Sequence, residues 1–119
     1  MLEIGSLITE GRTKRLYATG SPDEAVMFFK DEAIAYHGLK RGRILGKGEV
    51  NNEICNHLFT LLSERGIPNH YLRKLDARQS LVRRLDMIPL EVKVRNFAAG
   101  TLCERLGIPE GTRLNAPVL

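Results

Sequence analysis

The residues with the clearest chemical potential lie in one stretch, Met87–Thr101. Apolar and charged residues alternate through its middle, in the order Leu90, Glu91, Val92, Lys93, Val94 and Arg95. This period of two predicts a half-buried strand whose opposite face carries one acid and two bases. In the small-residue segment that follows, the backbone at Gly100 can approach a ligand and the Thr101 hydroxyl can hold an anion. The same pattern is also that of an ordinary antiparallel strand with a solvated charged face.

A second group of basic residues surrounds the turn signal at Gly11–Thr13. A tight glycine turn exposes backbone N–H groups, and Arg12 and Lys14 can sit against phosphate oxygens beside it. Without context, chance surface charge gives the same string. Lys30 closes an apolar strand, where it can either reach an ATP phosphate or turn toward solvent.

The segment Gly46–Asn52 is similar to a phosphate-binding P-loop, but it does not match that motif. Gly42 is one residue too close, and Gly48 stands where the Mg²⁺-binding Ser or Thr belongs. The segment leads into a predicted helix whose N-terminus favours an anion, and N-capping is the simpler role for the same residues. A zinc site is not expected, because Cys55 and His57 are too close for the usual pairing and have no second pair.

The elements that must position these residues form an α+β pattern with an antiparallel sheet and one long helix. The helix is predicted over residues 49–65, with an apolar face and a stop at Gly66 and Pro68. Strands are predicted near residues 4–8, 16–19, 25–30, 71–75 and 81–85, and a short helix over 102–106. Residues 36–48 are glycine-rich and basic, so we expect a mobile loop there. The apolar face of the long helix is expected to comprise Val50, Ile54, Leu58, Leu61, Leu62 and Cys55.

Length and composition predict one domain over residues 1–119, of a soluble globular class with 43% hydrophobic and 27% charged residues. The sequence has neither a signal-peptide pattern nor an apolar run of membrane-spanning length, so we expect a cytoplasmic location and no membrane partner. A net charge of +4 predicts an anionic partner. Because aromatic residues do not interleave with the basic ones, nucleic acid is the less favoured partner.

The motifs resemble, in order and spacing, those of the SAICAR synthetase family, the phosphoribosylaminoimidazole-succinocarboxamide synthases of purine biosynthesis. Glu91, Arg95 and Gly100 fall in register with the family's signature. Two positions differ from it: Thr101 stands where the family usually has Ser, and Lys93 stands where an apolar residue is more common. The turn around Arg12 and Lys14 matches a Gly-Lys-Ala-Lys-x-apolar-Tyr stretch of the family. A Lys-Gly-x-x-Asn-Asn stretch matches as well, at Lys47–Asn52.

The resemblance implies the fold of the family's N-terminal nucleotide-binding lobe and an ATP-dependent ligase activity. The substrates would be CAIR, a phosphoribosyl-carboxyaminoimidazole, and L-aspartate, with ATP and Mg²⁺ as cofactors, and a homo-oligomer would be compatible. The family's second signature and its Mg²⁺-binding acids would lie beyond Leu119, so no metal ligand is assigned within the chain. We therefore expect an N-terminal part of a protein about twice as long.

The resemblance also implies roles for individual residues. ATP would be bound by Arg12, Lys14, Lys30 and Met87, with Met87 placed where the family receives the adenine. The imidazole nucleotide would be bound by Glu91, Arg95, Gly100 and Thr101. Glu91 and Arg95 would be catalytic, with Glu91 accepting a hydrogen bond from the substrate or helping to place a metal. Two alternatives remain: a non-catalytic nucleotide-binding fragment and a small basic RNA-binding module.

Overall fold

The computed structural model describes residues 2–118, and the chain divides into two compact units, Met1–Asp86 and Met87–Leu119. That residues 1–119 form one domain stays a prediction. The predicted α+β class with an antiparallel sheet and one long helix is confirmed. Within residues 2–118, no helix is both long and apolar enough to cross a membrane.

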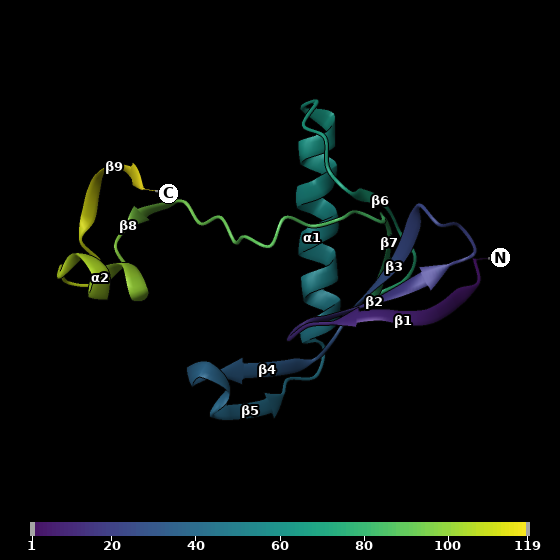
Figure 1. Ribbon diagram of the computed structural model, residues 1–119, viewed down its shortest axis with the longest axis horizontal. Coiled ribbons are helices and arrows are strands. Elements are labelled where there is room, and N and C mark those ends of the chain that lie inside the picture. Colours follow the sequence, from purple (N-terminus) through teal and green to yellow (C-terminus); the bar gives the residue numbers. More distant parts are fainter. Residues whose placement is uncertain (1, 119) are drawn as a thin grey trace. The chain divides into compact units, whose positions relative to one another are not determined.

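The first unit is built on a five-stranded antiparallel sheet in the order β1-β2-β3-β7-β6 (Figure 1). Its strands are β1 (Ile4–Glu10), β2 (Lys14–Thr19), β3 (Glu24–Phe29), β6 (Tyr71–Lys74) and β7 (Gln79–Arg83). The central strands β3 and β7 carry the buried apolar side chains of this unit: Ala25, Val26, Phe29, Leu81 and Val82. The strands expected from the alternation pattern are therefore confirmed, with small shifts at their ends.

One long helix, α1 (Lys47–Glu64), packs on this sheet and contacts β3, β6 and β7. The expected apolar face of this helix is wrong: Val50, Ile54 and Leu58 are each more than half exposed. Leu61, Leu62 and Cys55 are half-buried, and the buried positions are Gly48, Asn52 and Asn56. The physical reason is that this side of α1 meets the backbone of the β6–β7 turn, which asparagine amides can bond and leucine side chains cannot.

The expected loop over residues 36–48 is largely ordered secondary structure. Strands β4 (Glu32–Ala35) and β5 (Lys40–Arg43) pair as a separate antiparallel hairpin, with a 3₁₀ turn, η1 (Tyr36–Gly38), at its tip. Local pairing of two short strands satisfies the backbone without a hydrophobic core, which the glycine-rich composition did not reveal.

The second unit consists of β8 (Arg95–Phe97), α2 (Thr101–Leu106) and β9 (Arg113–Val118), with β8 and β9 antiparallel. The strand predicted through Leu90–Val94 is wrong: these residues form no strand, and Leu90, Val92 and Val94 are 65–77% exposed. Alternation favours a strand only where a partner supplies the ladder. No residue that the structure describes pairs with this segment.

Candidate functional site

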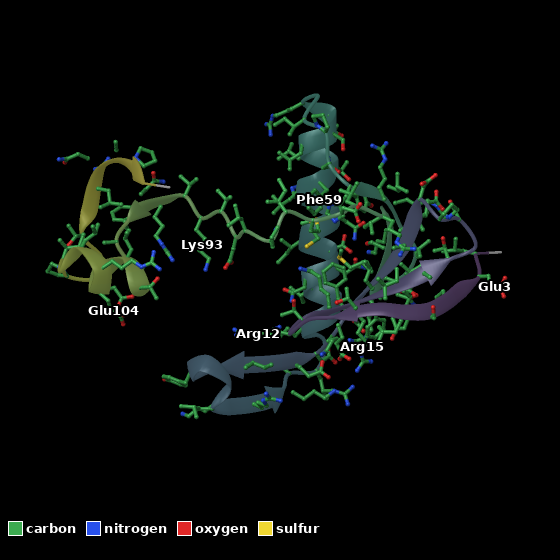
Figure 2. All side chains as sticks on the ribbon, viewed as in Figure 1. Glu3, Arg12, Arg15, Phe59, Lys93 and Glu104 are labelled. Carbon is green, nitrogen blue, oxygen red and sulfur yellow. The ribbon has the colours of Figure 1, made fainter. Side chains whose placement is uncertain are left out.

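The turn between β1 and β2 is the best-defined candidate for binding an anion. The Gly11 N–H donates to the Lys14 carbonyl at 2.9 Å and closes the turn, which leaves Arg12 and Thr13 at its tip. Neither the Arg12 nor the Thr13 N–H donates to a backbone acceptor among the described residues. Arg12 is exposed at this end of the hairpin, as Figure 2 shows. Unpaired amides beside two cations suit phosphate oxygens.

Lys30 holds this turn at several points. Its ammonium donates to Glu10 Oε1 at 2.7 Å and to the Gly11 carbonyl at 3.1 Å, and its backbone N–H donates to the Thr13 carbonyl at 2.8 Å. The Lys30 side chain is only 10% exposed. Glu10 Oε1 also accepts from Arg15 Nε at 2.9 Å. Lys30, and then Arg15, hold the pKa of the Glu10 carboxyl below its usual value.

The two lysines expected to bind ATP leave opposite faces of the sheet. Lys14 is the cross-strand partner of Phe29, and its ammonium lies 5.6 Å from the centre of that ring, so both side chains share a face. Lys30 follows Phe29 directly, and its side chain lies with Arg15 and Glu10 on the other face. The structure therefore groups Arg12 and Lys14 around the turn and gives Lys30 protein partners.

Asp31 receives the N-terminus of α1. Its carboxylate is 2% exposed and accepts from Arg78 Nη1 at 2.7 Å, from Arg78 Nη2 at 3.0 Å and from the Gly48 N–H at 2.9 Å. The Arg78 guanidinium, followed by the Gly48 amide, lowers the Asp31 pKa from 3.8 to about 2. The sequence suggested an external anion or N-capping by a helix residue here, yet the carboxylate comes from the protein itself, and the N-cap residue Gly46 has no side chain.

A buried amide network fixes α1 against the β6–β7 turn. Asn52 is fully buried and donates through Nδ2 to the carbonyls of Asp76 and Ala77 at 3.0 and 3.1 Å. Asn56 donates to Ser80 Oγ at 3.1 Å, and Ser80 Oγ donates to Asn52 Oδ1 at 2.6 Å. This network explains why the helix carries asparagines where apolar residues were expected.

A cavity of about 230 Å³ near Lys30 is lined by basic and acidic side chains together: Arg15, Lys30, Arg43, Arg78, Asp31 and Glu32, with Phe28. Three of its four cations have close partners, since Lys30 and Arg15 contact Glu10 and Arg78 contacts Asp31 and Glu49. The fourth, Arg43, is 72% exposed, and its Nε lies 3.9 Å from Asp31 Oδ2. Ion pairs within the protein therefore account for most of the positive charge around this cavity.

The remaining expected site residues lie in the second unit. Glu91 pairs with Lys93 at 3.1 Å, with both side chains more than half exposed, and Met87 is 80% exposed. Arg95 begins β8 and is half-buried. Gly100 has φ +56°, a conformation that favours glycine, and Thr101 follows it as the first residue of α2. In the part of the chain that the structure describes, no three His, Cys, Asp or Glu side chains gather to hold a metal.

The sequence did not indicate three of these residues: Glu10 beside the β1–β2 turn, and Asp31 and Arg78 at the N-terminus of α1. Asp31 stands next to Lys30 after an apolar strand, which is a usable signal for a strand-end ion pair. Arg78 is 47 residues away from Asp31 in sequence, so only the fold pairs them.

The known proteins that this chain resembles belong to one family. The family model described as SAICAR synthetase matches residues 7–119. The phosphoribosylaminoimidazole-succinocarboxamide synthase of Brevibacillus brevis is 53% identical over 110 residues, which are 92% of this chain and 46% of that protein. The corresponding protein of Deinococcus deserti is 48% identical over 115 residues, covering 97% and 48% of the two chains.

Two solved structures share the fold. The crystal structure of phosphoribosylaminoimidazole-succinocarboxamide synthase from Ehrlichia chaffeensis superposes with a TM-score of 0.90 at 38% identity, over 95% of this chain and 48% of that chain. A SAICAR synthetase solved in complex with ADP gives a TM-score of 0.88 at 40% identity, with the same coverage. This chain spans about half the length of these relatives.

Proposed function

This chain belongs to the SAICAR synthetase family, and we propose that it contributes the nucleotide-binding part of an ATP-dependent ligase that joins CAIR to L-aspartate. The observation that carries the proposal is the β1–β2 turn. Its Arg12 and Thr13 N–H groups donate to no backbone acceptor within residues 2–118, and they lie beside the side chains of Arg12 and Lys14. A relative at 40% identity was solved with ADP, which supports a nucleotide as the ligand.

The chemistry explains why such a turn is needed. A carboxylate is a poor electrophile, because its leaving oxygen would be an anion. Transfer of the ATP γ-phosphoryl group to the carboxylate of CAIR gives an acyl-phosphate and ADP, and the aspartate amine then displaces phosphate to form the amide. Arg12, Lys14 and the turn amides would hold the ATP phosphates in line for that transfer. Mg²⁺ belongs to the proposal as counterion of these phosphates, with no ligand to it assigned in this chain.

The second unit would bind the imidazole nucleotide. Arg95 and Thr101 would hold its anionic groups, the backbone at Gly100 would allow close approach, and Glu91 would accept a hydrogen bond from the substrate. Met87 would adjoin the adenine of ATP. The present partner of Glu91 is Lys93, an exposed ion pair that substrate can replace at little cost.

ADP release in the presence of CAIR, L-aspartate and Mg-ATP tests the proposal. The assay compares this chain with a form extended to the length of its relatives. Turnover by the extended form alone supports the ligase assignment and makes this chain an incomplete active site. If neither form releases ADP in a manner dependent on both CAIR and aspartate, the assignment fails, and salt-dependent RNA binding becomes the test of the basic-module alternative.

A further inference from the structure

We infer that Glu10 and Lys30 act as a positioning pair for the β1–β2 turn, holding its carbonyls so that its amides stay available to phosphate. The inference rests on the proposed function, since it assigns a task to residues beside the same turn. It replaces the direct contact between Lys30 and ATP that the sequence suggested.

The hydrogen bonds around the turn are distributed unevenly between its carbonyls and its amides. Lys30 engages the carbonyl oxygens of Gly11 and Thr13, one through its ammonium and one through its backbone N–H. The carbonyls of this turn accept hydrogen bonds from Lys30, while the Arg12 and Thr13 N–H groups donate to no backbone acceptor among the described residues. These N–H groups therefore present partial positive charge to an anion. Without the Lys30 ammonium, the Gly11 carbonyl would be free to rotate toward the bound phosphate and repel it, while the backbone N–H of residue 30 would still hold the Thr13 carbonyl.

The Lys30 ammonium is largely buried and already has protein partners. Its side chain is 10% exposed, and two of its three donors are already used by Glu10 and Gly11. It lies on the sheet face opposite Lys14, which stacks on Phe29. Lys30 therefore supports the turn from one face while Lys14 remains exposed on the other.

Glu10 connects the turn to two neighbouring cations. Its carboxylate contacts Lys30 and also Arg15, which lies on the neighbouring strand β2. Glu10 is the last residue of β1 and directly precedes the turn. By binding one cation from β2 and one from the end of β3, it fixes the start of the turn to both strands.

The test uses two substitutions in this chain, Lys30→Met and Glu10→Gln, with ATP binding measured by calorimetry. The matched controls are Lys74→Met and Glu53→Gln, which remove the same charges from an exposed ion pair away from the turn. Loss of a hydrogen-bonded charge should weaken ATP binding roughly tenfold or more in Lys30→Met. Glu10→Gln should weaken binding by a smaller factor, and Lys30→Arg should restore most of the affinity. The control variants should bind ATP as the unaltered chain does.

Glu10→Gln separates positioning from direct contact, because the two roles predict opposite signs. If Lys30 binds phosphate itself, Glu10 competes for it, and Glu10→Gln should tighten ATP binding. That result would overturn the inference. The Glu10 side chain is 39% exposed, and a glutamine oxygen can still accept hydrogen bonds from Lys30 and Arg15, so we expect this variant to fold even if Lys30→Met does not.

A second measurement, hydrogen exchange of the Gly11 amide without nucleotide, distinguishes failure of the inference from failure of the proposed function. Exchange at Gly11 should speed up in both variants, while exchange at Leu81 in β7 stays unchanged. Unchanged exchange at Gly11 together with normal ATP binding would overturn the positioning role alone. Absence of ATP binding by the unaltered chain would refute the nucleotide assignment of the turn and the inference with it.

Discussion

Gly48 is the position where a one-carbon change should have the largest effect for its size. A Cβ at Gly48 would lie 2.3 Å from the Phe29 carbonyl oxygen and 2.9 Å from Arg78 Nη1. The first neighbour is backbone of a buried strand, so no side-chain rotation relieves the contact, and α1 must shift away from β3. Overpacking of this kind costs about 3 kcal/mol, the upper part of the usual range.

Helix propensity opposes this cost. Replacing a helical glycine by alanine ordinarily stabilises a protein by about 1 kcal/mol, because alanine loses less backbone entropy on folding. The net expectation for Gly48→Ala is therefore a loss of about 2 kcal/mol in the free energy of unfolding. The shift would also lengthen the hydrogen bond from the Gly48 N–H to Asp31.

Urea denaturation followed by far-ultraviolet circular dichroism measures this change, because α1 supplies 18 of the helical residues and α2 only 6. Gly42→Ala is the matched control: a Cβ there meets nothing within 4 Å, and its free energy of unfolding should change by less than about 0.5 kcal/mol. A Gly48→Ala chain as stable as the unaltered one, or more stable, would refute the close approach of α1 to β3.

Three further results are expected. Because the Asp31 pKa is lowered from 3.8 to about 2, the ionised carboxylate stabilises the folded chain fully above pH 3.8, and this stabilisation is lost as the pH falls toward 2. In urea titrations, Asp31→Asn should remove this part of the pH dependence of the free energy of unfolding. An unchanged pH profile would contradict the pairing of Asp31 with Arg78. Asn52→Ala removes a fully buried amide together with its hydrogen bonds to the Asp76 and Ala77 carbonyls, and should lower the free energy of unfolding by about 2–4 kcal/mol. The control Asn51→Ala, at a half-buried neighbouring position, should lower it by about 0.5 kcal/mol or less. In the form extended to the length of the relatives, Arg95→Ala should lower kcat/KM for CAIR roughly thirty- to several-hundred-fold, and unchanged kinetics would rule out its contact with substrate.

The sequence predicted the strands of the first unit well, because their alternation of apolar and polar residues is reinforced by turn residues such as Gly20 and Pro22. It failed at Leu90–Val94, where the same alternation occurs without a partner strand among the described residues. Periodicity reports which side chains share a face, and pairing depends on a second segment that periodicity does not identify.

The long helix is a second element whose sequence pattern predicted only part of its structure. Its existence and its end near Gly66 followed from composition and stop signals. Its buried side did not, because the apolar stripe through Ile54 is exposed and the buried side carries Asn52. A hydrophobic pattern predicts burial only where the surface opposite is apolar. Here the opposite surface is a turn whose carbonyls require hydrogen-bond donors, and Asn52 supplies them.

The sequence by itself determined the family resemblance, the α+β class, the glycine turn with Arg12 and Lys14, and the basic character that suits an anionic ligand. Those properties reside in residue types and short spacings, which are fixed along the chain. The tertiary structure alone decided that Lys30 bonds Glu10 and the turn instead of standing beside Lys14, and that Asp31 meets Arg78. These pairings depend on strand register and on contacts between residues far apart in sequence, and a change of one residue in register would place each side chain on the other face.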